Sequence, residues 1–192
     1  AITDYFAESP VSYLSLNCNT ISRRSTSQMA TLPFEHVILG DNVSNLNQNA
    51  FYEARQLTTV EIGSGITSIS ERAFTLCTSL TSINIPSSVT SIGDWAFSSC
   101  RSLTSIDIPR GVTSIGYEAF KNCSGLTAIT VNATTPPALG YNAFGGSSCQ
   151  IYVPCSSIGA YLAANNWSDY GGRINGIPPC EGLDVKYVFR LT

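Results

Sequence analysis

The sequence predicts a repeat solenoid built mostly of short parallel β-strands and turns with little helix, in about five 23-residue coils that are capped at both ends. One observation is that the phrase Leu80–Cys100 returns almost unchanged at Leu103–Cys123, 23 positions later. A second is that apolar residues recur at this offset along most of the chain. Self-similarity at such a period is typical of short units that cannot bury an apolar face alone and must stack on their neighbours.

Three columns of apolar residues carry the period through successive units. Their members are Phe34, Leu57, Leu80, Leu103 and Leu126; Val37, Val60, Ile83, Ile106 and Ile129; and Leu39, Ile62, Ile85, Ile108 and Val131. Because every position is aliphatic or aromatic, we expect the columns to lie inside the solenoid. Within one unit, Ile106 and Ile108 alternate with Ser105 and Asp107, which predicts a strand with the isoleucines inward and the polar residues outward.

Each unit then closes through turns. Pro109 ends the first strand, Val112–Ile115 forms a second short extended stretch, and Gly116–Cys123 completes the coil through a tight turn or a single helical turn. In the fifth unit the period lengthens by one position at Pro136-Pro137. Two adjacent prolines remove two backbone donors, so this insertion is expected to be a bulged turn rather than a paired strand.

The stretch Ile108–Leu126 has the form Ile-Pro-Xaa-Xaa-Val-Thr-Ser-Ile-Gly-Xaa-Xaa-Ala-Phe-Xaa-Xaa-Cys-Xaa-Xaa-Leu, which resembles the leucine-rich repeat of the bacterial surface antigen (BspA-like) class. The resemblance covers residues 34–150, and Ile151–Tyr170 resembles the capping segment that often follows such repeats. It implies a secreted or cell-surface bacterial recognition and adhesion module that binds a host or neighbouring-cell protein through its repeat surface. We therefore expect one continuous domain with an N-terminal cap at 1–33, a leucine-rich repeat array at 34–150 and a C-terminal cap at 151–192.

The two flanks are expected to cover the apolar ends of the solenoid. In the C-terminal flank a short helix is predicted over Ser156–Asn166, with a serine at its N-cap, and Trp167 and Tyr170 complete this lid. Farther on, alternation across Val185–Leu191 predicts a half-buried terminal strand. At the other end, Val11–Cys18 is expected to cover the first coil.

The seven cysteines separate by repeat position. Cys77, Cys100 and Cys123 share one position, which Ala54 fills in the first unit, so we expect a ladder of small buried residues with free thiols. Parallel Cβ vectors disfavour disulfides within this ladder, although a spacing of about 4.8 Å would permit them. The remaining four are expected outside the ladder: Cys18, Cys149, Cys155 and Cys180. For Cys155, pairing with Cys149 or with Cys180 stays open, whereas the stacked coils would separate Cys18 from Cys180 by about 20 Å.

Composition excludes some functions and favours a secreted protein. Only 12% of the residues are charged, with a formal net charge of −3 and no basic run, which argues against a nucleic-acid partner. No apolar stretch approaches the roughly 20 residues that a membrane span requires. A surface rich in Ser, Thr and Asn suits an extracellular array, so we expect a processed or trimmed chain that is secreted or at the cell surface, with a cytosolic fragment as the alternative.

We expect neither an enzyme nor a cofactor or metal site. The one histidine, His36, takes an outward strand position without a matching catalytic motif. Glu61 and Asp107 share a column but lie two coils apart, about 10 Å, which exceeds the separation of a retaining glycosidase pair. Glycines such as Gly93 and Gly116 recur with the repeat and serve turns, and the Cys-Xaa-Xaa-Cys spacing of a zinc site does not occur.

The candidate binding surface combines outward strand residues with larger side chains on the adjoining turns. Its predicted members are His36, Thr59, Glu61, Ser82, Asn84, Ser105, Asp107 and Thr130 in the strand columns, and Trp95 and Tyr117 at the turns. The columns hold small polar groups with little area to bury, whereas Asp94, Glu118 and Tyr141 extend the patch at the turns. Two alternatives to protein binding stay open: a glycan-binding module, which requires Trp95 and Tyr117 to be exposed together, and a structural spacer with no ligand of its own.

Overall fold

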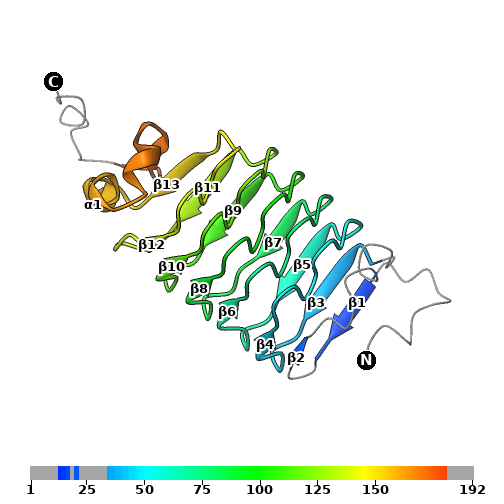
Figure 1. The fold of residues 1–192 in the computed structure, drawn as a ribbon. Helices are drawn as coiled ribbons and strands as arrows, with labels where there is room; N and C mark the ends of the chain where they lie inside the picture. Colours follow the sequence, from blue (N-terminus) through cyan, green and yellow to red (C-terminus); the bar gives the residue numbers. More distant parts are fainter. Residues whose placement is uncertain (1–12, 18–19, 22–33, 181–192) are drawn as a thin grey trace.

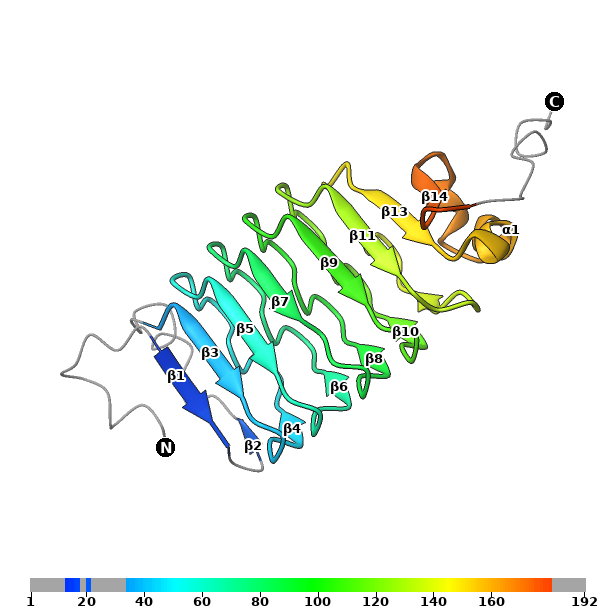
Figure 2. The same ribbon diagram turned by 180° about the vertical axis from the view of Figure 1, so that it is seen from behind.

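A computed structural model describes residues 13–17, 20–21 and 34–180, which wind into a solenoid whose coils stack along one axis (Figure 1). The longer strands form what we call the strand wall: β1 (Tyr13–Leu16), β3 (His36–Leu39), β5 (Thr59–Ile62), β7 (Ser82–Asn84), β9 (Ser105–Ile108), β11 (Ala128–Val131) and β13 (Gln150–Val153). Two-residue strands form the short-strand wall: β2 (Thr20–Ile21), β4 (Asn45–Leu46), β6 (Ser68–Ile69), β8 (Ser91–Ile92), β10 (Ser114–Ile115) and β12 (Ala138–Leu139). Figure 2 shows the strand wall from the other side, with its strands in chain order.

The paired strands are parallel and keep the predicted register. Ile83 lies beside Val60 in one sheet, and Ile106 lies beside Ile129 in the next. Within β9, Ile106 and Ile108 are buried while the two polar residues of the strand are exposed. The solenoid, its parallel strands and its inward apolar columns are therefore confirmed.

The solenoid extends one coil beyond the five that were predicted. β1 pairs with β3 so that Leu14 lies beside Val37 and Leu16 beside Leu39. Both leucines are buried and lie 23 positions before their partners, but the rest of their unit does not match the repeat motif. The predicted N-terminal cap at 1–33 therefore contains β1, Asn17 and β2, and the remainder of that range, with Cys18, lies outside the described residues.

A column of stacked aromatic rings runs inside the coils: Phe51, Phe74, Phe97, Phe120, Phe144 and Trp167. The first four rings are nearly parallel, with centroids 5.1 to 5.4 Å apart. Trp167 comes from the C-terminal flank and continues the column 5.7 Å from Phe144. Full burial of such a ring contributes about 1.5–3 kcal/mol, so each coil gains stability from the coil beside it.

The cysteine column is a ladder of buried free thiols, as predicted. Each thiol donates to a phenylalanine carbonyl of the preceding coil: Cys77 to Phe51 at 3.1 Å, Cys100 to Phe74 at 3.1 Å and Cys123 to Phe97 at 3.0 Å. Cys149 is also buried and free, and it lies near enough to Cys123 to raise the pKa of that thiol. Cys149 stands 23 positions after Leu126, so by spacing it continues the first apolar column and not the cysteine ladder.

Threonine hydroxyl groups join consecutive coils on both walls. Thr58, Thr81 and Thr127 donate to the carbonyl oxygen of the residue 23 positions earlier, at 2.7 to 3.0 Å. On the short-strand wall, Thr90 and Thr113 do the same at 3.2 Å. The repeated Thr-Ser pairs of the sequence therefore serve the stacking of the coils.

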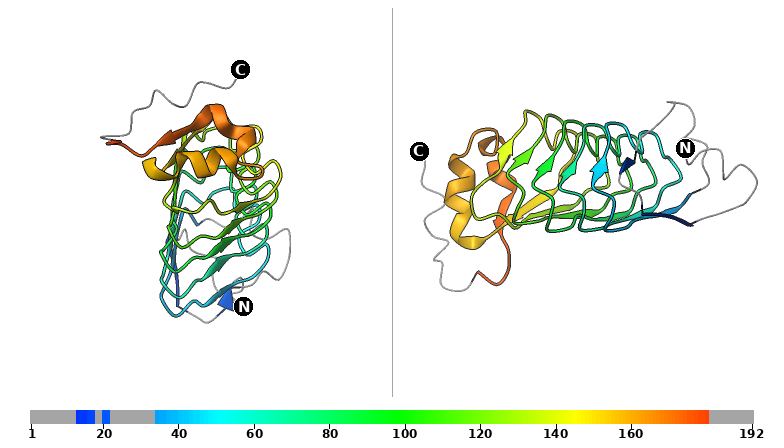
Figure 3. Two further views of the ribbon diagram at one scale, coloured as in Figure 1. Left: turned by 90° about the vertical axis from the view of Figure 1, so that its left-hand side faces the viewer. Right: turned by 90° about the horizontal axis from the view of Figure 1, so that it is seen from below.

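The C-terminal flank forms the predicted lid, which lies across the last coil (Figure 3). It comprises η2 (Cys155–Ser157), α1 (Ile158–Ala163), η3 (Ser168–Arg173) and β14 (Ile174–Gly176). The N-cap position of α1 is held by Ser157, which makes no side-chain capping bond. β14 pairs with β13 and was not predicted, while the predicted strand Val185–Leu191 lies outside the described residues. Over 13–17, 20–21 and 34–180, no helix has the length and apolarity that crossing a bilayer demands.

Polar groups of the lid pair with backbone carbonyl groups that the last coil would otherwise leave open. Three donors do this: Tyr161 Oη to Ala133 at 2.7 Å, Trp167 Nε1 to Pro137 at 2.7 Å and Asn166 Nδ2 to Leu139 at 2.6 Å. Tyr161 and Trp167 are fully buried, so they also fill the apolar end of the core. The lid thus satisfies the hydrogen-bonding groups of the last coil as well as covering its apolar surface.

A disulfide between Cys155 and Cys180 closes the lid into one covalent loop. This bond decides between the two pairings that were open for Cys155 and leaves Cys149 as a free thiol. The backbone of β14 packs directly against the disulfide, because a Cβ atom at Gly176 would lie 2.2 Å from the sulfur of Cys180.

Replacing Tyr161 by Phe is expected to lower the free energy of unfolding by about 1–3 kcal/mol, because the buried carbonyl of Ala133 loses its donor. Urea denaturation followed by circular dichroism measures the change. Tyr152→Phe on the strand wall is the matched control and should stay within about 0.5 kcal/mol of the parent. Equal losses in the two variants would contradict a role for the Tyr161 hydroxyl.

The ladder thiols should resist alkylation in the folded chain. Burial raises the pKa of Cys77 and Cys100 far above the ordinary value and that of Cys123 to about 12, so the reactive thiolate is scarce. Between pH 7 and pH 9, iodoacetamide labelling should accelerate in urea and stay negligible in the native protein. Peptide mass spectrometry of both states measures this, and native labelling of Cys100 at the unfolded rate would refute it.

Candidate binding surface

The predicted strand residues lie in two polar columns along the strand wall. In the half that runs from β3 to β7, the neighbours are His36, Thr59 and Ser82 in one column and Glu61 and Asn84 in the other. In the half that starts at β9, Ser105 precedes Ala128 and Asp107 precedes Thr130. The Nδ1 atom of His36 lies 2.6 Å from Oγ1 of Thr59, which ties the imidazole to the wall. These columns form a surface of small polar groups without a large side chain at its centre.

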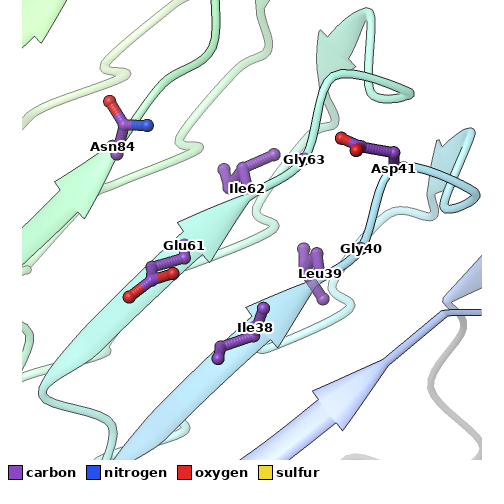
Figure 4. Close-up of a pocket in the computed structure, with 8 residues that line it drawn as sticks. All are labelled: Ile38, Leu39, Gly40, Asp41, Glu61, Ile62, Gly63 and Asn84. Atoms are coloured by element: carbon purple, nitrogen blue, oxygen red, sulfur yellow. The ribbon is translucent and has the colours of Figure 1, made fainter.

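A shallow hollow of about 520 Å³ opens where β3 and β5 end, and Asp41, Glu61 and Asn84 provide its polar groups (Figure 4). The Oδ1 atom of Asp41 accepts hydrogen bonds from the backbone nitrogen of Ser64 at 2.7 Å and its hydroxyl at 2.9 Å. Those two bonds hold the pKa of Asp41 below its ordinary value. The carboxylate of Asp41 therefore serves the turn between coils, and within the described ranges three or more His, Cys, Asp or Glu residues do not gather as metal ligands.

Larger side chains gather at the turns that follow β8, β10 and β12. The rings of Trp95 and Tyr117 meet edge to face with centroids 5.1 Å apart, and Tyr141 stacks on Tyr117 at 6.1 Å. The guanidinium of Arg72 lies over Trp95, 4.2 Å from the ring centroid. We call this patch the aromatic corner, and its members are Arg72, Trp95, Tyr117, Glu118, Lys121 and Tyr141.

Glu118 holds the aromatic corner together and is only 7% exposed. Its carboxylate accepts hydrogen bonds from Nζ of Lys121 at 2.7 Å, Nε1 of Trp95 at 3.0 Å and Nδ2 of Asn142 at 3.4 Å. The bond from Lys121 lowers the pKa of Glu118 most, and the bonds from Trp95, Tyr117 and Asn142 add to it against the effect of burial. One carboxylate thus fixes side chains from three consecutive coils.

The backbone of the aromatic corner is also constrained. Arg72, Trp95, Glu118 and Asn142 share one repeat position and adopt positive φ angles of 50 to 56°, which residues other than glycine rarely do. Bonds between coils hold this conformation, since Trp95 N donates to Tyr117 O at 2.9 Å and Arg72 N donates to Asp94 O at 2.9 Å. Such positions persist only where the surroundings determine them, so the aromatic corner is rigid before any partner arrives.

The structure brings Trp95 and Tyr117 together but places them apart from the strand columns, at the turns after β8 and β10. Sequence reasoning grouped Trp95, Tyr117, Glu118 and Tyr141 but missed Arg72 and Lys121. The period did carry a signal for Arg72, because one full period back from Trp95 arrives at it. Lys121 follows Glu118 by three positions, and its contact depends on a turn conformation that no motif announces.

Comparison with known proteins supports the repeat. The sequence model of the BspA type leucine-rich repeat region matches residues 16–151 in six copies, one more than the five coils predicted. No curated protein matches the chain.

Three solved structures resemble the fold. A leucine-rich repeat protein from Bacteroides ovatus is 26% identical with a TM-score of 0.62, over 77% of this chain and 37% of that one. A leucine-rich cell surface protein from Faecalibacterium prausnitzii is 21% identical with a TM-score of 0.58, over 86% of this chain and 48% of that one. The T. pallidum leucine-rich repeat protein is 24% identical with a TM-score of 0.52, over 76% of this chain and 73% of that one. This chain therefore spans less than half the length of the first two.

Replacing Glu118 by Gln is expected to destabilise the folded chain by about 1 kcal/mol near pH 7, because the charged acceptor of the Lys121 and Trp95 bonds is lost. The pKa of Glu118 is lower in the folded state than its ordinary value of 4.5, so its contribution is present above that value and disappears as the pH falls through the folded pKa. Urea denaturation at pH 7 and at pH 3 measures the difference.

The difference in the free energy of unfolding between the parent and Glu118→Gln should therefore be smaller at pH 3 than at pH 7. The control is Glu61→Gln on the strand wall, whose free energy of unfolding is expected to equal that of the parent at both pH values. A gap for Glu118→Gln that grows as the pH falls would refute the assignment.

Proposed function

The chain belongs to the BspA type leucine-rich repeat family, and from this premise we propose that it is a recognition module of a bacterial cell surface that binds a partner protein through its aromatic corner. Proteins of this family are commonly surface-associated, and the neighbour from Faecalibacterium prausnitzii is a cell surface protein. The partner would be a protein of a host or of a neighbouring cell. The repeats of this family are typically binding scaffolds rather than enzymes, so the proposal involves no catalysis and no cofactor.

One observation carries the proposal. Tyr117, 37% exposed, and Tyr141, 65% exposed, are the large hydrophobic side chains that the described part of the chain leaves exposed, and they stack on each other. Tyr, Trp and Arg dominate the residues that supply most of the affinity at protein interfaces, and the aromatic corner holds all three types. From β3 to β11 the strand columns contain none of them, so we assign this stretch of the columns a lesser part in affinity.

Rigidity strengthens the case for the aromatic corner. Ordering a free side chain on binding costs about 0.5–1.5 kcal/mol, and the bonds to Glu118 have already ordered Trp95 and Lys121. Tyr117 and Tyr141 restrict each other by stacking. A partner therefore meets a surface whose conformational entropy is already low.

Secretion or display at the cell surface fits the cysteine chemistry. The Cys155–Cys180 disulfide is a bond of oxidising compartments and is rare in the cytosol. The ladder thiols stay reduced in such a compartment because they are buried. This chemistry favours the secreted or cell-surface location over a cytosolic fragment.

Glycan binding is the weaker alternative. Sugars stack on the open face of an aromatic ring, but Arg72 lies over Trp95 and Tyr141 stacks on Tyr117. Tyr141, with 65% of its surface exposed, is the ring that best keeps room for a sugar. A glycan site would then rest on one tyrosine, whereas a protein partner can also use ring edges and the charges of Arg72 and Lys121.

Binding to purified matrix proteins and mucins, measured by biolayer interferometry with a glycan array in parallel, tests the proposal. Tyr117→Ser combined with Tyr141→Ser is expected to weaken binding to a protein ligand at least tenfold, because two anchors of about 1–2 kcal/mol or more are removed. The matched control, Glu61→Gln with Asn84→Ser on the strand wall, should change affinity less than threefold.

Each other outcome has a defined meaning. Loss of binding only in the strand-wall variant would move the site to the columns and overturn the assignment. Hits confined to the glycan array would favour the sugar alternative. A chain that binds nothing in either panel is what the structural spacer predicts.

A further inference from the structure

One joint on the strand wall lacks the hydrogen bonds that join the other strands. β1, β3, β5 and β7 form one hydrogen-bonded sheet, and β9, β11, β13 and β14 form another. β7 and β9 follow each other in the stack but share no ladder, although both strands lie fully within the described residues. Ile83 in β7 is 8% exposed while Ile106 in β9 is 2% exposed, so water reaches slightly deeper on the β7 side.

The threonine column breaks at the same joint. Thr81 N donates to Thr58 O at 2.9 Å and Thr127 N donates to Thr104 O at 2.9 Å, and the hydroxyl groups of both threonines repeat these bonds at 3.0 Å. Thr104 makes neither bond to Thr81 within the part of the chain that the structure describes. Backbone and side-chain links are therefore lost together at this joint.

Proline contributes to the separation of these two strands at their ends. After β5 the backbone nitrogen of Gly63 donates to Leu39 O at 2.7 Å, and after β11 that of Asn132 donates to Ile108 O at 3.0 Å. Pro109 holds the same position after β9 and has no N–H to give to Ile85. Proline at this position thus removes the backbone N–H that would otherwise form a hydrogen bond between the end of β9 and the end of β7.

Pro86 takes the equivalent position after β7 and shows what proline does alone. The ladder of β5 with β7 persists there, but it is one residue pair shorter than the ladder of β3 with β5. The bonds of Thr81 to Thr58 keep that joint closed. Loss of the proline donor and of the threonine bonds together therefore distinguishes the joint between β7 and β9.

The other side of the same joint is closed. β8 pairs with β10 on the short-strand wall, and Phe97 stacks on Phe120 at 5.1 Å. The aromatic corner also crosses the joint there, because Trp95 donates to Glu118 from the preceding coil. Hydrogen bonds are thus lost on one side of the rod and kept on the other.

We propose that the solenoid bends at the joint between β7 and β9, opening the strand wall about a hinge line that runs along the short-strand wall and the aromatic corner. Opening at this joint breaks no ladder hydrogen bond between β7 and β9, so it costs less than opening at a joint whose strands are paired. Pro109 helps to maintain the hinge by withholding a donor that would close it. Trp95 and Tyr117 lie at the hinge line, so they keep their contact while the strand wall opens. This proposal holds whether or not the aromatic corner binds a partner.

Hydrogen exchange measured by NMR on the full chain tests the missing hydrogen bonds at this joint. The amide of Thr104 should exchange at least tenfold faster than the amides of Thr81 and Thr127, which are the matched controls because each also follows a leucine. Pro109→Asn, which copies the residue after β11, should slow the exchange of Thr104 toward that of Thr127. Equal exchange at the three threonines, or no slowing in the folded Pro109→Asn variant, would overturn the proposal.

Spin labels test the bending itself. In a Cys18→Ser background, labels at Glu61→Cys and Thr130→Cys span three joints that include the hinge, and labels at Asp107→Cys and Asn175→Cys span three joints that do not. Both pairs stand about 14 Å apart at one strand spacing per coil, within the range of continuous-wave electron paramagnetic resonance. The pair across the hinge should give the broader distance distribution, and equal widths would overturn the hinge.

Discussion

The alignment of each coil over the preceding coil is the constraint on which the rest of the structure depends. Most coils place their residues directly over those 23 positions earlier, and where the offset changes to 24 or 22 the apolar and aromatic columns still stay aligned. The tightest contacts show how little room the register leaves, since a Cβ atom at Gly140 would lie 2.3 Å from the carbonyl carbon of Gly116. The same register lets weak interactions accumulate: a ring stacks on a ring, a hydroxyl meets a carbonyl and a thiol meets a carbonyl at coil after coil.

The aromatic corner uses this register for a second purpose. Strands supply the close stacking, but the turns supply the larger side chains, and a buried carboxylate at Glu118 draws three coils into one patch. A partner that contacts this patch would contact residues far apart in sequence and rigidly spaced in structure. The strand wall, by contrast, offers small polar side chains together with the carboxylates of Glu61 and Asp107.

Much of the fold follows from the spacing of residues, and what does not follow has identifiable physical causes. Ile106 and Ile108 are buried where alternation places them, and the thiols of Cys77, Cys100 and Cys123 are buried and free as their shared position indicates. β1 was not predicted because the sequence of its unit departs from the repeat motif. Lys121 was missed because its contact with Glu118 depends on turn geometry, whereas Arg72 was overlooked although it shares the repeat position of Trp95. The open joint could not be predicted at all, since the two units that flank it, Leu80–Cys100 and Leu103–Cys123, are the most alike in the chain.

The lid contacts the final coil through Ala133, Pro137 and Leu139, and is locked by its own disulfide. The contacts of the lid therefore do not depend on the number of coils that precede the final one. Duplication or deletion of one whole repeat in the gene would lengthen or shorten the rod by about 4.8 Å and leave both the termination and the neighbouring interfaces intact. Evolution can in this way tune the reach of such a protein in uniform increments without redesigning its end.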